Sequence, residues 1–317
     1  MKKILVFGSF VVDLTSRADR LPQPGETVLG SGFKLGPGGK GSNQAVAAHR
    51  AGADSILATK VGRDVFGQVA LDFYTAEGMP VDLIMRDDEV ETGTALIMVN
   101  EREGQNMILV VIGACGNIQD EDIRKAEEQI RGADILMLQL EINQDALEKI
   151  IDIAHEAGTR IVLNPAPARH LSPALLAKVD TLTPNETEAA LLSGVPIKSF
   201  DDAKKAARVL LDMGVRNLVI TMGSMGAYVT DGTREEVIPS IKVDAVDTTG
   251  AGDAFNGGLI TALSEGMDLF DAARFGNATG ALSVTKLGTA PAMPHRADIE
   301  ALCAREYPTL RFNTRKE

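Results

Sequence analysis

The sequence contains little cysteine or histidine and no long apolar run. Its two cysteines, Cys115 and Cys303, are too few for a disulfide framework, which favours a reducing cytoplasm. Its four histidines lack metal-ligand spacing, so no structural histidine metal site is expected. No segment approaches the roughly 18 apolar residues of a membrane-spanning helix. The start, MKKILVFGSF, is too short for a signal peptide and has no cleavage site.

Basic residues are scarce relative to acidic ones. The chain has 32 lysines and arginines against 44 aspartates and glutamates, a formal net charge of -12. Such a surface repels a phosphate backbone, so nucleic acid is not an expected partner. With 317 residues, 44% of them hydrophobic, the chain can bury a large core. Its 31 glycines and 4% aromatic content suit an α/β protein with many tight turns, and we expect a single domain over residues 1–317.

Short apolar runs alternate with amphipathic helical patterns along most of the chain. KKILVFG and SILATKVG are predicted to be strands, while NQAVAAHRAG and VFGQVALDFYTAEG are predicted to be helices that end at Gly52 and Gly78. The same alternation runs from ADILMLQL to RNLVITMG. Strands that alternate with helices predict a mostly parallel sheet with helices on both faces.

Two segments, about residues 11–38 and 88–112, break this alternation. TGTALIMVNEREGQNMILVVIG predicts a β-hairpin around EREGQ, and RADRLPQPGETVLGSGFKLGPGG is extended and rich in turns. Together they predict a small β-sheet, either a lid over a cleft or surface decoration. The acidic cluster QDEDIRKAEEQ is expected to be the solvated face of a helix, and the tail over 306–317 is expected to fray.

The stretch GPGGKGSN first suggests a phosphate-binding loop, but the pattern fails. Lys34 stands where the first glycine of that motif is required, and Gly41 replaces the hydroxyl residue after Lys40. Paired glycines before a helix allow a ligand to lie against the backbone, while Lys40 and Asn43 offer donors suited to hydroxyl groups. A plain tight turn is the alternative interpretation.

The stretch VDAVDTTGAGDAFNGG places Gly250, Gly252 and Asp253 just before an apolar helical pattern. Glycines there leave backbone N–H groups unpaired at the positive end of a helix dipole, which binds an anion without a lysine. Asp253 is then placed to accept a proton from a hydroxyl held beside that anion. An alcohol next to an anion hole indicates phosphoryl transfer. The alternative is that Asp253 only complements the helix dipole.

Several motifs, in order over nearly the whole chain, resemble the ribokinase family of carbohydrate kinases. They are GGKGSNQAVAA, LQLE at 138–141, LNPAPAR at 163–169, TPNETE at 183–188, TMGSMGA at 221–227 and DTTGAGDAFNGG at 247–258. The resemblance implies a ribokinase-like α/β fold with a β lid and an ATP-dependent sugar kinase of the cytoplasm. By family analogy, it also implies a homodimer formed through the lid.

The resemblance also implies roles for particular residues. Asp253 would be the base that activates the sugar hydroxyl, and the amides of Gly250, Ala251 and Gly252 would hold the transferring phosphoryl group. The positions implied to hold the sugar are Asp13, Gly39, Lys40, Asn43 and Glu141.

The remaining implied positions concern the nucleotide and two metal ions. Asn185 and Glu188 match positions near the phosphates and their Mg²⁺. The positions implied to line the nucleotide pocket are Thr221, Gly223, Ser224, Gly226 and Asn277. A monovalent-cation loop, in which mainly backbone carbonyls would bind K⁺, is implied at Asp247, Thr249, Ser283, Lys286, Gly288 and Ala292.

The sequence departs from the family pattern at Val11, where members that phosphorylate ribose usually carry an asparagine. Valine offers no hydrogen bond, and relatives that act on deoxyribose also have an apolar residue there. We expect phosphorylation of the C5 hydroxyl of D-ribose, with 2-deoxy-D-ribose as the alternative. Kinases of nucleosides or hexose derivatives share the phosphate half of this site, and a sugar or nucleotide sensor without catalysis is disfavoured by the intact Asp253.

Overall fold

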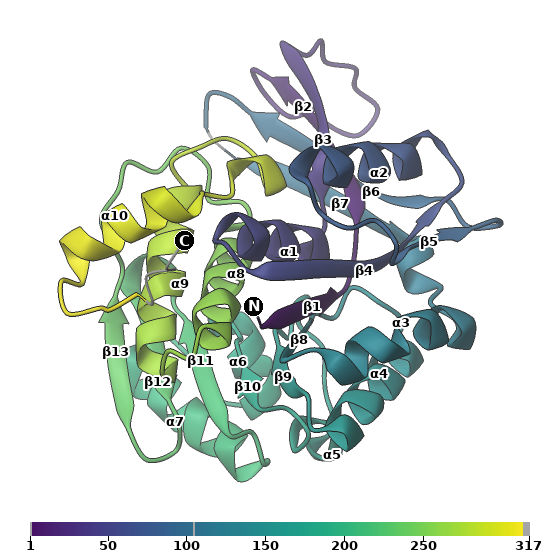
Figure 1. The fold of residues 1–317 in the computed structure, drawn as a ribbon. Helices are drawn as coiled ribbons and strands as arrows, with labels where there is room; N and C mark the ends of the chain where they lie inside the picture. The colour runs from purple at the N-terminus through teal and green to yellow at the C-terminus, as the bar shows by residue number, and fades with distance from the viewer. Residues whose placement is uncertain (1, 104, 313–317) are drawn as a thin grey trace.

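A computed structural model describes residues 2–103 and 105–312 of the chain and is built around a nine-stranded sheet (Figure 1). The strand order is β13-β12-β11-β10-β9-β8-β1-β4-β5. All neighbouring strands are parallel except β12, which is antiparallel to both of its neighbours. The strands are β1 (Lys3–Phe7), β4 (Asp54–Gly62), β5 (Ile84–Asp87), β8 (Ile135–Leu138), β9 (Arg160–Leu163), β10 (Thr181–Leu182), β11 (Asn217–Thr221), β12 (Gly226–Thr230) and β13 (Glu235–Pro239).

Helices cover both faces of this sheet, as the sequence predicts. One face packs against α1 (Lys40–Arg50), α2 (Val65–Glu77), α8 (Ala251–Ser264), α9 (Leu269–Ser283) and α10 (Arg296–Glu306). The other packs against α3 (Asp120–Gly132), α4 (Gln144–Ala157), α5 (Pro173–Leu176), α6 (Glu186–Ser193) and α7 (Phe200–Asp212). Because side chains alternate along a strand, Ile4 and Val6 of β1 enter the first core, whereas Leu5 and Phe7 enter the second.

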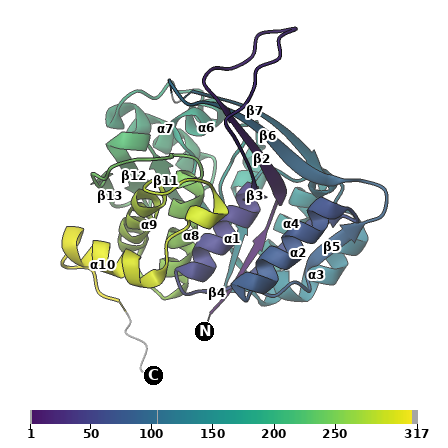
Figure 2. The ribbon, with the colours of Figure 1, turned by 90° about the horizontal axis from the view of Figure 1, so that it is seen from above.

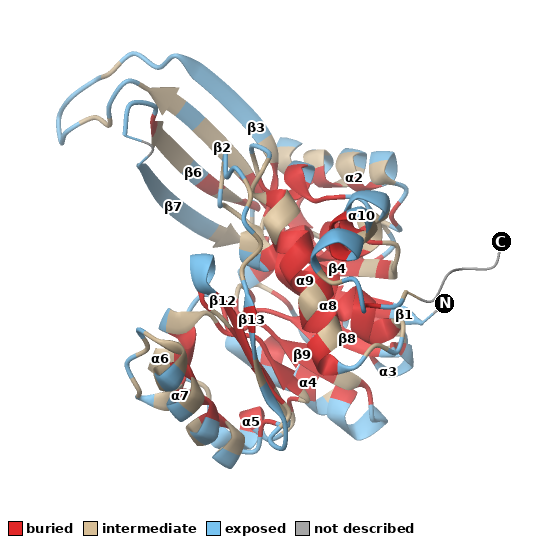
Figure 3. Cartoon of the chain, turned by 90° about the vertical axis from the view of Figure 1, so that its left-hand side faces the viewer, coloured by how far each residue is buried: buried red, intermediate tan, exposed pale blue. Residues whose placement is uncertain are grey.

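The first core brings α1 and α8 unusually close together. A Cβ atom on Gly257 of α8 would lie 2.3 Å from the Cβ of Ala47 and 2.9 Å from the amide nitrogen of Ala48, both in α1. Only glycine therefore permits this approach. The first turns of α1 and α8 also lie side by side, since Asn43 and Gln44 donate hydrogen bonds to Asp253. Most residues of both helices are buried, and Figure 3 shows α8 in the centre of the buried region.

The irregular segments form a separate four-stranded sheet, which we call the lid sheet. Its order is β3-β2-β6-β7, with β2 parallel to β6 and the outer pairs antiparallel. The strands are β2 (Val11–Ala18), β3 (Gly32–Gly38), β6 (Thr92–Asn100) and β7 (Asn106–Gly113). The lid sheet projects from the main body, and the connection between β2 and β3 extends beyond it (Figure 2). The predicted β6–β7 hairpin is present, although Gly104 in its turn lies outside the described residues.

The C-terminal segment is expected to fray from residue 306, but residues beyond this position pack against the main body. Leu310 is buried, and the Phe312 ring lies edge-on to Phe275 of α9. Residues 313–317 lie outside the described part of the chain. Over the described residues, we find no helix with both the length and the apolar character to span a bilayer. Three short 3₁₀ helices complete the described chain: η1 (Ala114–Gly116), η2 (Gly223–Met225) and η3 (Ala290–Ala292).

Candidate active site

The glycine turn before α8 leaves backbone amides unpaired. Gly250 is the N-cap of α8, with a φ of 77° that favours glycine, and the helix begins at Ala251. Among the described residues, none accepts a hydrogen bond from the amides of Gly250, Gly252 or Asp253. The Ala251 amide differs from expectation because it donates to the carbonyl of Thr248 at 3.3 Å. The free amides lie at the positive end of the helix dipole, where an anion is stabilised.

Asp253 lies in the first turn of α8, with both carboxylate oxygens held by amides from α1. The Asn43 Nδ2 donates to Oδ2 at 2.8 Å, and the Gln44 Nε2 donates to Oδ1 at 2.9 Å. Burial raises the pKa of Asp253 above its ordinary value, and the charge of Lys40 and the two amide bonds only partly offset this effect. A raised pKa suits a proton acceptor, because it makes the carboxylate a stronger base.

Gln44, which sequence reasoning missed, connects Asp253 to a buried network of amides. Its Nε2 also donates to Asn164 Oδ1 at 3.1 Å, and its Oε1 accepts from Gln139 Nε2 at 2.6 Å. Asn164 in turn donates to the carbonyl of Thr183 at 2.8 Å. The available signal was its place directly after Asn43 in GGKGSNQ, but nothing in the pattern shows that its side chain turns toward Asp253.

Glu141 follows β8 and lies against the start of α1. One of its oxygens accepts from the Ser9 hydroxyl and from the Lys40 amide at 2.9 Å, and Lys40 Nζ lies 3.8 Å from the other oxygen. Burial lowers the pKa of Lys40, but the charges of Asp253, Glu141 and Glu188 outweigh it, so that its pKa is raised. Lys40 is therefore a charged donor within an acidic site.

Asp13 of β2 lies at the base of the lid sheet. Its carboxylate occupies the space beside Gly38, because a Cβ there would lie 2.2 Å from Oδ1. The Thr289 hydroxyl donates to Oδ2 at 2.8 Å. Burial raises the pKa of Asp13 to about 6, with Glu141 and Asp253 adding to the effect and Thr289 and Lys40 opposing it. Val11, on the same face of β2, is 3% exposed.

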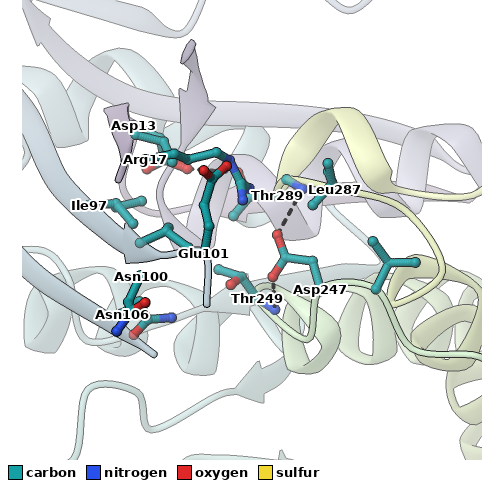
Figure 4. A pocket seen from close by; sticks show the side chains of 14 residues that line it. Asp13, Arg17, Ile97, Asn100, Glu101, Asn106, Asp247, Thr249, Leu287 and Thr289 are labelled. Atoms are coloured by element: carbon teal, nitrogen blue, oxygen red, sulfur yellow. Dashed lines mark hydrogen bonds between the residues drawn. The ribbon is translucent and has the colours of Figure 1, made fainter. Parts of the chain in front are cut away.

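A cavity of about 320 Å³ opens between the lid sheet and the loops around Asp247 and Thr289. Asp13, Arg17 and Ile97 line it from the lid side, while Asp247 and Thr289 line it from the opposite side (Figure 4). Gly39, the N-cap of α1, joins β3 to the helix that carries Lys40 and Asn43. Of the predicted sugar-binding residues, Asp13 alone lines this cavity. The contacts of Lys40 with Glu141 and of Asn43 with Asp253 bring the others together at the starts of α1 and α8.

The positions expected to contact the nucleotide lie around the ends of β11 and β12. Asn185 caps α6, and its side chain and that of Glu188 form a reciprocal capping box. Asn185 also bridges Thr221 at the end of β11. The remaining expected positions are Gly223 and Ser224 in η2, Gly226 at the start of β12, and Asn277 in α9, whose Nδ2 donates to the Pro239 carbonyl and the Tyr307 hydroxyl.

The predicted cation loop presents oxygen atoms that the described protein leaves without donors. The carboxylate of Asp247 accepts from the amides of Thr249 and Gly288, each at 3.0 Å. Burial raises the pKa of Asp247, but these bonds and the charge of Arg17 outweigh it and lower the pKa. Within the described residues, no donor reaches the carbonyls of Thr249, Lys286, Gly288 and Ala292; the Ser283 carbonyl accepts from the Lys286 amide at 3.2 Å. Free carbonyls beside a carboxylate are suitable ligands for a hard cation.

No group of three or more histidine, cysteine, aspartate or glutamate side chains within the described residues could hold a metal ion by itself. Mg²⁺ in kinases needs no such cage, because one or two carboxylates and the substrate phosphates hold it. Glu188 is buried beside Asn185, and its pKa is raised by burial, with the charge of Lys40 opposing. Both of its carboxylate oxygens accept hydrogen bonds from Asn185, one from the backbone amide and one from the side-chain amide.

Comparisons with known proteins agree with this geometry. The family model "pfkB family carbohydrate kinase" matches residues 1–296. The chain is a member of the pfkB family of carbohydrate kinases. The kinase is 39% identical over 297 residues to a ribokinase of Haemophilus influenzae, covering 94% of this chain and 97% of the relative. It is 36% identical to a deoxyribokinase of Salmonella typhi, covering 92% and 95%.

The fold of the kinase is also shared with solved structures. The structure of an Arabidopsis thaliana ribokinase complexed with ribose and ATP has a TM-score of 0.86 and 29% identity, covering 95% of this chain and 98% of that one. The kinase therefore has the ribokinase-like α/β fold, in which the predicted parallel sheet flanked by helices is confirmed. Family membership also confirms an ATP-dependent sugar kinase.

Proposed function

We propose that the kinase transfers the γ-phosphoryl group of ATP to the C5 hydroxyl of D-ribose, forming D-ribose 5-phosphate. The observation that carries this proposal is the buried Asp253 carboxylate beside the unpaired amides of Gly250 and Gly252. A general base next to an anion hole supports transfer of a phosphoryl group to an alcohol. The relatives named ribokinase support ribose as the acceptor.

In the proposed reaction, the C5 hydroxyl oxygen attacks the γ-phosphorus as its proton moves to Asp253. The bond between the γ-phosphorus and the β–γ bridging oxygen breaks, and ADP leaves. The amides of Gly250 and Gly252 stabilise charge on the transferring group. The Ala251 amide contributes only after its weak bond to Thr248 is released. Asn43 and Gln44 hold Asp253 in one orientation throughout. Most of the catalysis in such transfers comes from positioning and electrostatics.

The sugar is proposed to lie between β2 and the start of α1. Asp13 and Glu141 would accept hydrogen bonds from its hydroxyl groups, while Lys40 and Asn43 would donate hydrogen bonds to its oxygens. Asn43 Oδ1 is buried without a partner in the described protein, so it can accept from a sugar hydroxyl. Gly38 has no side chain, and this lets the Asp13 carboxylate take up its place against β3, where it would face the sugar.

A second candidate substrate, 2-deoxy-D-ribose, is favoured by Val11. Valine puts an apolar surface at a position where an asparagine would bond a hydroxyl, and the side chain is buried within β2. The deoxyribokinase of Salmonella typhi, 36% identical to the chain, supports this candidate. We place D-ribose first, because a neighbouring polar group or a water molecule can replace the missing amide.

We propose Mg²⁺ with ATP and K⁺ as an activator. Glu188 and Asn185 would lie near the phosphates and Mg²⁺, which supplies charge neutralisation. Thr221, Gly223, Ser224, Gly226 and Asn277 would line the nucleotide pocket. K⁺ would be held by the carbonyls of Thr249, Lys286, Gly288 and Ala292 beside Asp247, with Ser283 adjoining.

We further propose that the kinase works in the cytoplasm as a homodimer that pairs through the lid sheet. Cys115 and Cys303 are free and buried, which suits a reducing compartment. The lid sheet exposes apolar residues that a partner would cover: Phe33, Leu35, Leu96, Met107, Ile108, Leu109, Val110 and Val111. A run of exposed apolar residues of this kind is typical of an interaction surface.

Coupled ADP release with a panel of acceptors tests the substrate. The panel is D-ribose, 2-deoxy-D-ribose, other pentoses, hexoses and nucleosides, each assayed with Mg-ATP and K⁺. The account expects the highest kcat/KM for D-ribose or 2-deoxy-D-ribose. A higher value for a nucleoside or a hexose would contradict it, and no ADP release with any acceptor would favour a sensor.

A further inference from the structure

Thr289 joins the core of the molecule to the lid sheet at the sugar end of the site. It follows Gly288 in the segment between α9 and η3, and it is 8% exposed. Its hydroxyl donates to Asp13 Oδ2 at 2.8 Å and lies 3.0 Å from the carbonyl oxygen of Pro37. Asp13 belongs to β2 and Pro37 to β3, so one hydroxyl meets both strands at the base of the lid sheet.

The same segment is also tied to the loop before α8. The Gly288 amide donates to Asp247 Oδ2, and the Thr249 amide donates to Asp247 Oδ1. The dashed lines in Figure 4 show both bonds on one carboxylate. A continuous chain of contacts therefore runs from Asp13 through Thr289 and Gly288 to Asp247 and Thr249, directly before the turn at Gly250.

We propose that Thr289 is a positioning residue that couples the sugar-binding carboxylate of Asp13 to the cation loop. This inference rests on the proposed function, in which Asp13 binds the sugar and Asp247 adjoins K⁺. Thr289 is not a catalytic residue, because its contacts are to Asp13 and Pro37 rather than to a reacting group.

The proposed action of Thr289 follows from its single donor hydrogen. With Oδ2 of Asp13 engaged, Oδ1 remains available to a sugar hydroxyl, and the carboxylate is held in one rotamer. A hydroxyl has only one hydrogen for its two acceptors, so a small displacement of the segment changes how fully Asp13 is bonded. A cation held by the carbonyls of Lys286 and Gly288 would fix this segment. Cation binding therefore raises sugar affinity through Thr289.

The test uses Thr289→Val, which keeps the branched shape and removes the donor, and Thr289→Ser, which keeps the hydroxyl. Calorimetry measures the Kd of D-ribose, and of 2-deoxy-D-ribose, without nucleotide. Each is measured in K⁺ and in tetramethylammonium at equal ionic strength. We expect the valine variant to weaken sugar binding about tenfold in K⁺, the scale of a lost hydrogen bond to a charged group, and to lose the K⁺ dependence of Kd. The serine variant should retain both, and the KM for ATP should stay within about twofold in each.

Several outcomes overturn the proposal. A wild-type sugar Kd in the valine variant, or equal losses in the valine and serine variants, would show that the hydroxyl does not position Asp13. A wild-type Kd that is the same in both salts would show that the cation is not coupled to the sugar. The cation site of the proposed function is tested by a separate result: a wild-type kcat that does not change with K⁺ would contradict it. A thermal melt of each variant confirms that it is folded.

Discussion

At the scale of single residues, the base depends on neighbours that fix both of its oxygens. Asn43 and Gln44 are adjacent in α1, and each donates to a different oxygen of Asp253. Gln44 is itself held by Gln139, which is fully buried. A carboxylate bonded on both sides cannot rotate without breaking a bond, so the direction in which Asp253 accepts a proton is set before substrate arrives.

Val11 sets a prediction about sugar choice. Val11→Asn should raise the ratio of kcat/KM for D-ribose over that for 2-deoxy-D-ribose, because an amide can bond the 2-hydroxyl. This ratio should rise about tenfold for each 1.4 kcal/mol by which the new hydrogen bond stabilises the transition state with D-ribose. Steady-state kinetics with both sugars measure it. An unchanged or reversed ratio would show that Val11 does not govern the preference at C2.

Asp13 predicts a pH dependence of sugar binding. Its pKa is raised to about 6, mainly by burial, so the carboxylate takes up a proton as the pH falls through 6. A protonated carboxyl accepts hydroxyl hydrogens less well, and the Kd of D-ribose should therefore rise as the pH falls from 7.5 to about 5.5. Calorimetry at constant ionic strength measures this. Asp13→Asn should bind weakly with a smaller pH response, and a wild-type Kd that stays flat would contradict the assignment of Asp13.

The sequence predicts which residues belong to this site better than it predicts the contacts that those residues make. Asn43 and Asp253 are predicted because glycine-rich turns precede them, and turn chemistry is local. Ser9, Gln44 and Thr289 are missed, because their bonds join residues far apart in the chain: Thr289 lies 276 positions from Asp13. The local sequence around a polar residue does not indicate its hydrogen-bond partner when the tertiary fold brings that partner from a distant part of the chain.

At the scale of elements, a buried ion cluster fixes the base of the lid sheet. Lys60 of β4 lies 2.9 Å from Asp87 at the end of β5 and 2.9 Å from Asp122 in the first turn of α3, and Nζ also donates to the Asn117 carbonyl. Asp87 precedes the connection into β6, and Asn117 follows the exit from β7 through η1. Both connections between the β6–β7 hairpin and the main body are therefore tied to one ammonium group. Asp122 also corrects the expectation that the acidic cluster of α3 is wholly solvated, because it is 6% exposed.

Lys60→Met should destabilise the fold strongly, because it leaves two buried carboxylates without their cation. A loss of about 3–5 kcal/mol is the scale for such a change. Urea unfolding measures it. The matched control is Lys149→Met, whose ion pair with Asp120 is exposed to solvent and should contribute little to the free energy of unfolding. Equal effects of the two substitutions would show that the cluster does not hold the base of the lid sheet.

The sequence predicts the types of these elements but not how the lid strands pair. Period-two patterns and turns indicate β2, β3, β6 and β7, yet β2 pairs in parallel with β6 across 80 residues or so of intervening chain, as the pairing of Val11 with Gly93 shows. Which strands become neighbours depends on the main sheet, which carries both lid segments to the same edge. The hydrophobic pattern within a strand carries no information about a pairing partner so far away in the sequence.

At the scale of the whole molecule, the exposed lid sheet predicts dimerisation. Most of β7 is exposed (Figure 3), and Leu109 within it is 62% exposed. A partner lid sheet would cover this apolar side chain. Leu109→Glu should convert a dimer to a monomer in light scattering, since burying an unpaired carboxylate is unfavourable. Val65→Glu, on the exposed side of α2 at 75% exposure, is the control that should remain dimeric. A monomeric wild-type protein, or a dimer that persists in Leu109→Glu, would contradict pairing through this surface.

The central claim is that Asp253 accepts the proton of the sugar hydroxyl beside the free amides of α8, and Asp253→Asn tests it most directly. Asn43 can turn its amide so that Oδ1, which has no partner in the described protein, accepts from the new side chain, and the pocket keeps its shape. The measurement is kcat at saturating sugar and Mg-ATP in purified variant and wild type, with nucleotide affinity measured in parallel. The account predicts a loss in kcat of about 10²-fold or more, with nucleotide affinity little changed. Near-normal turnover in a folded variant would contradict it.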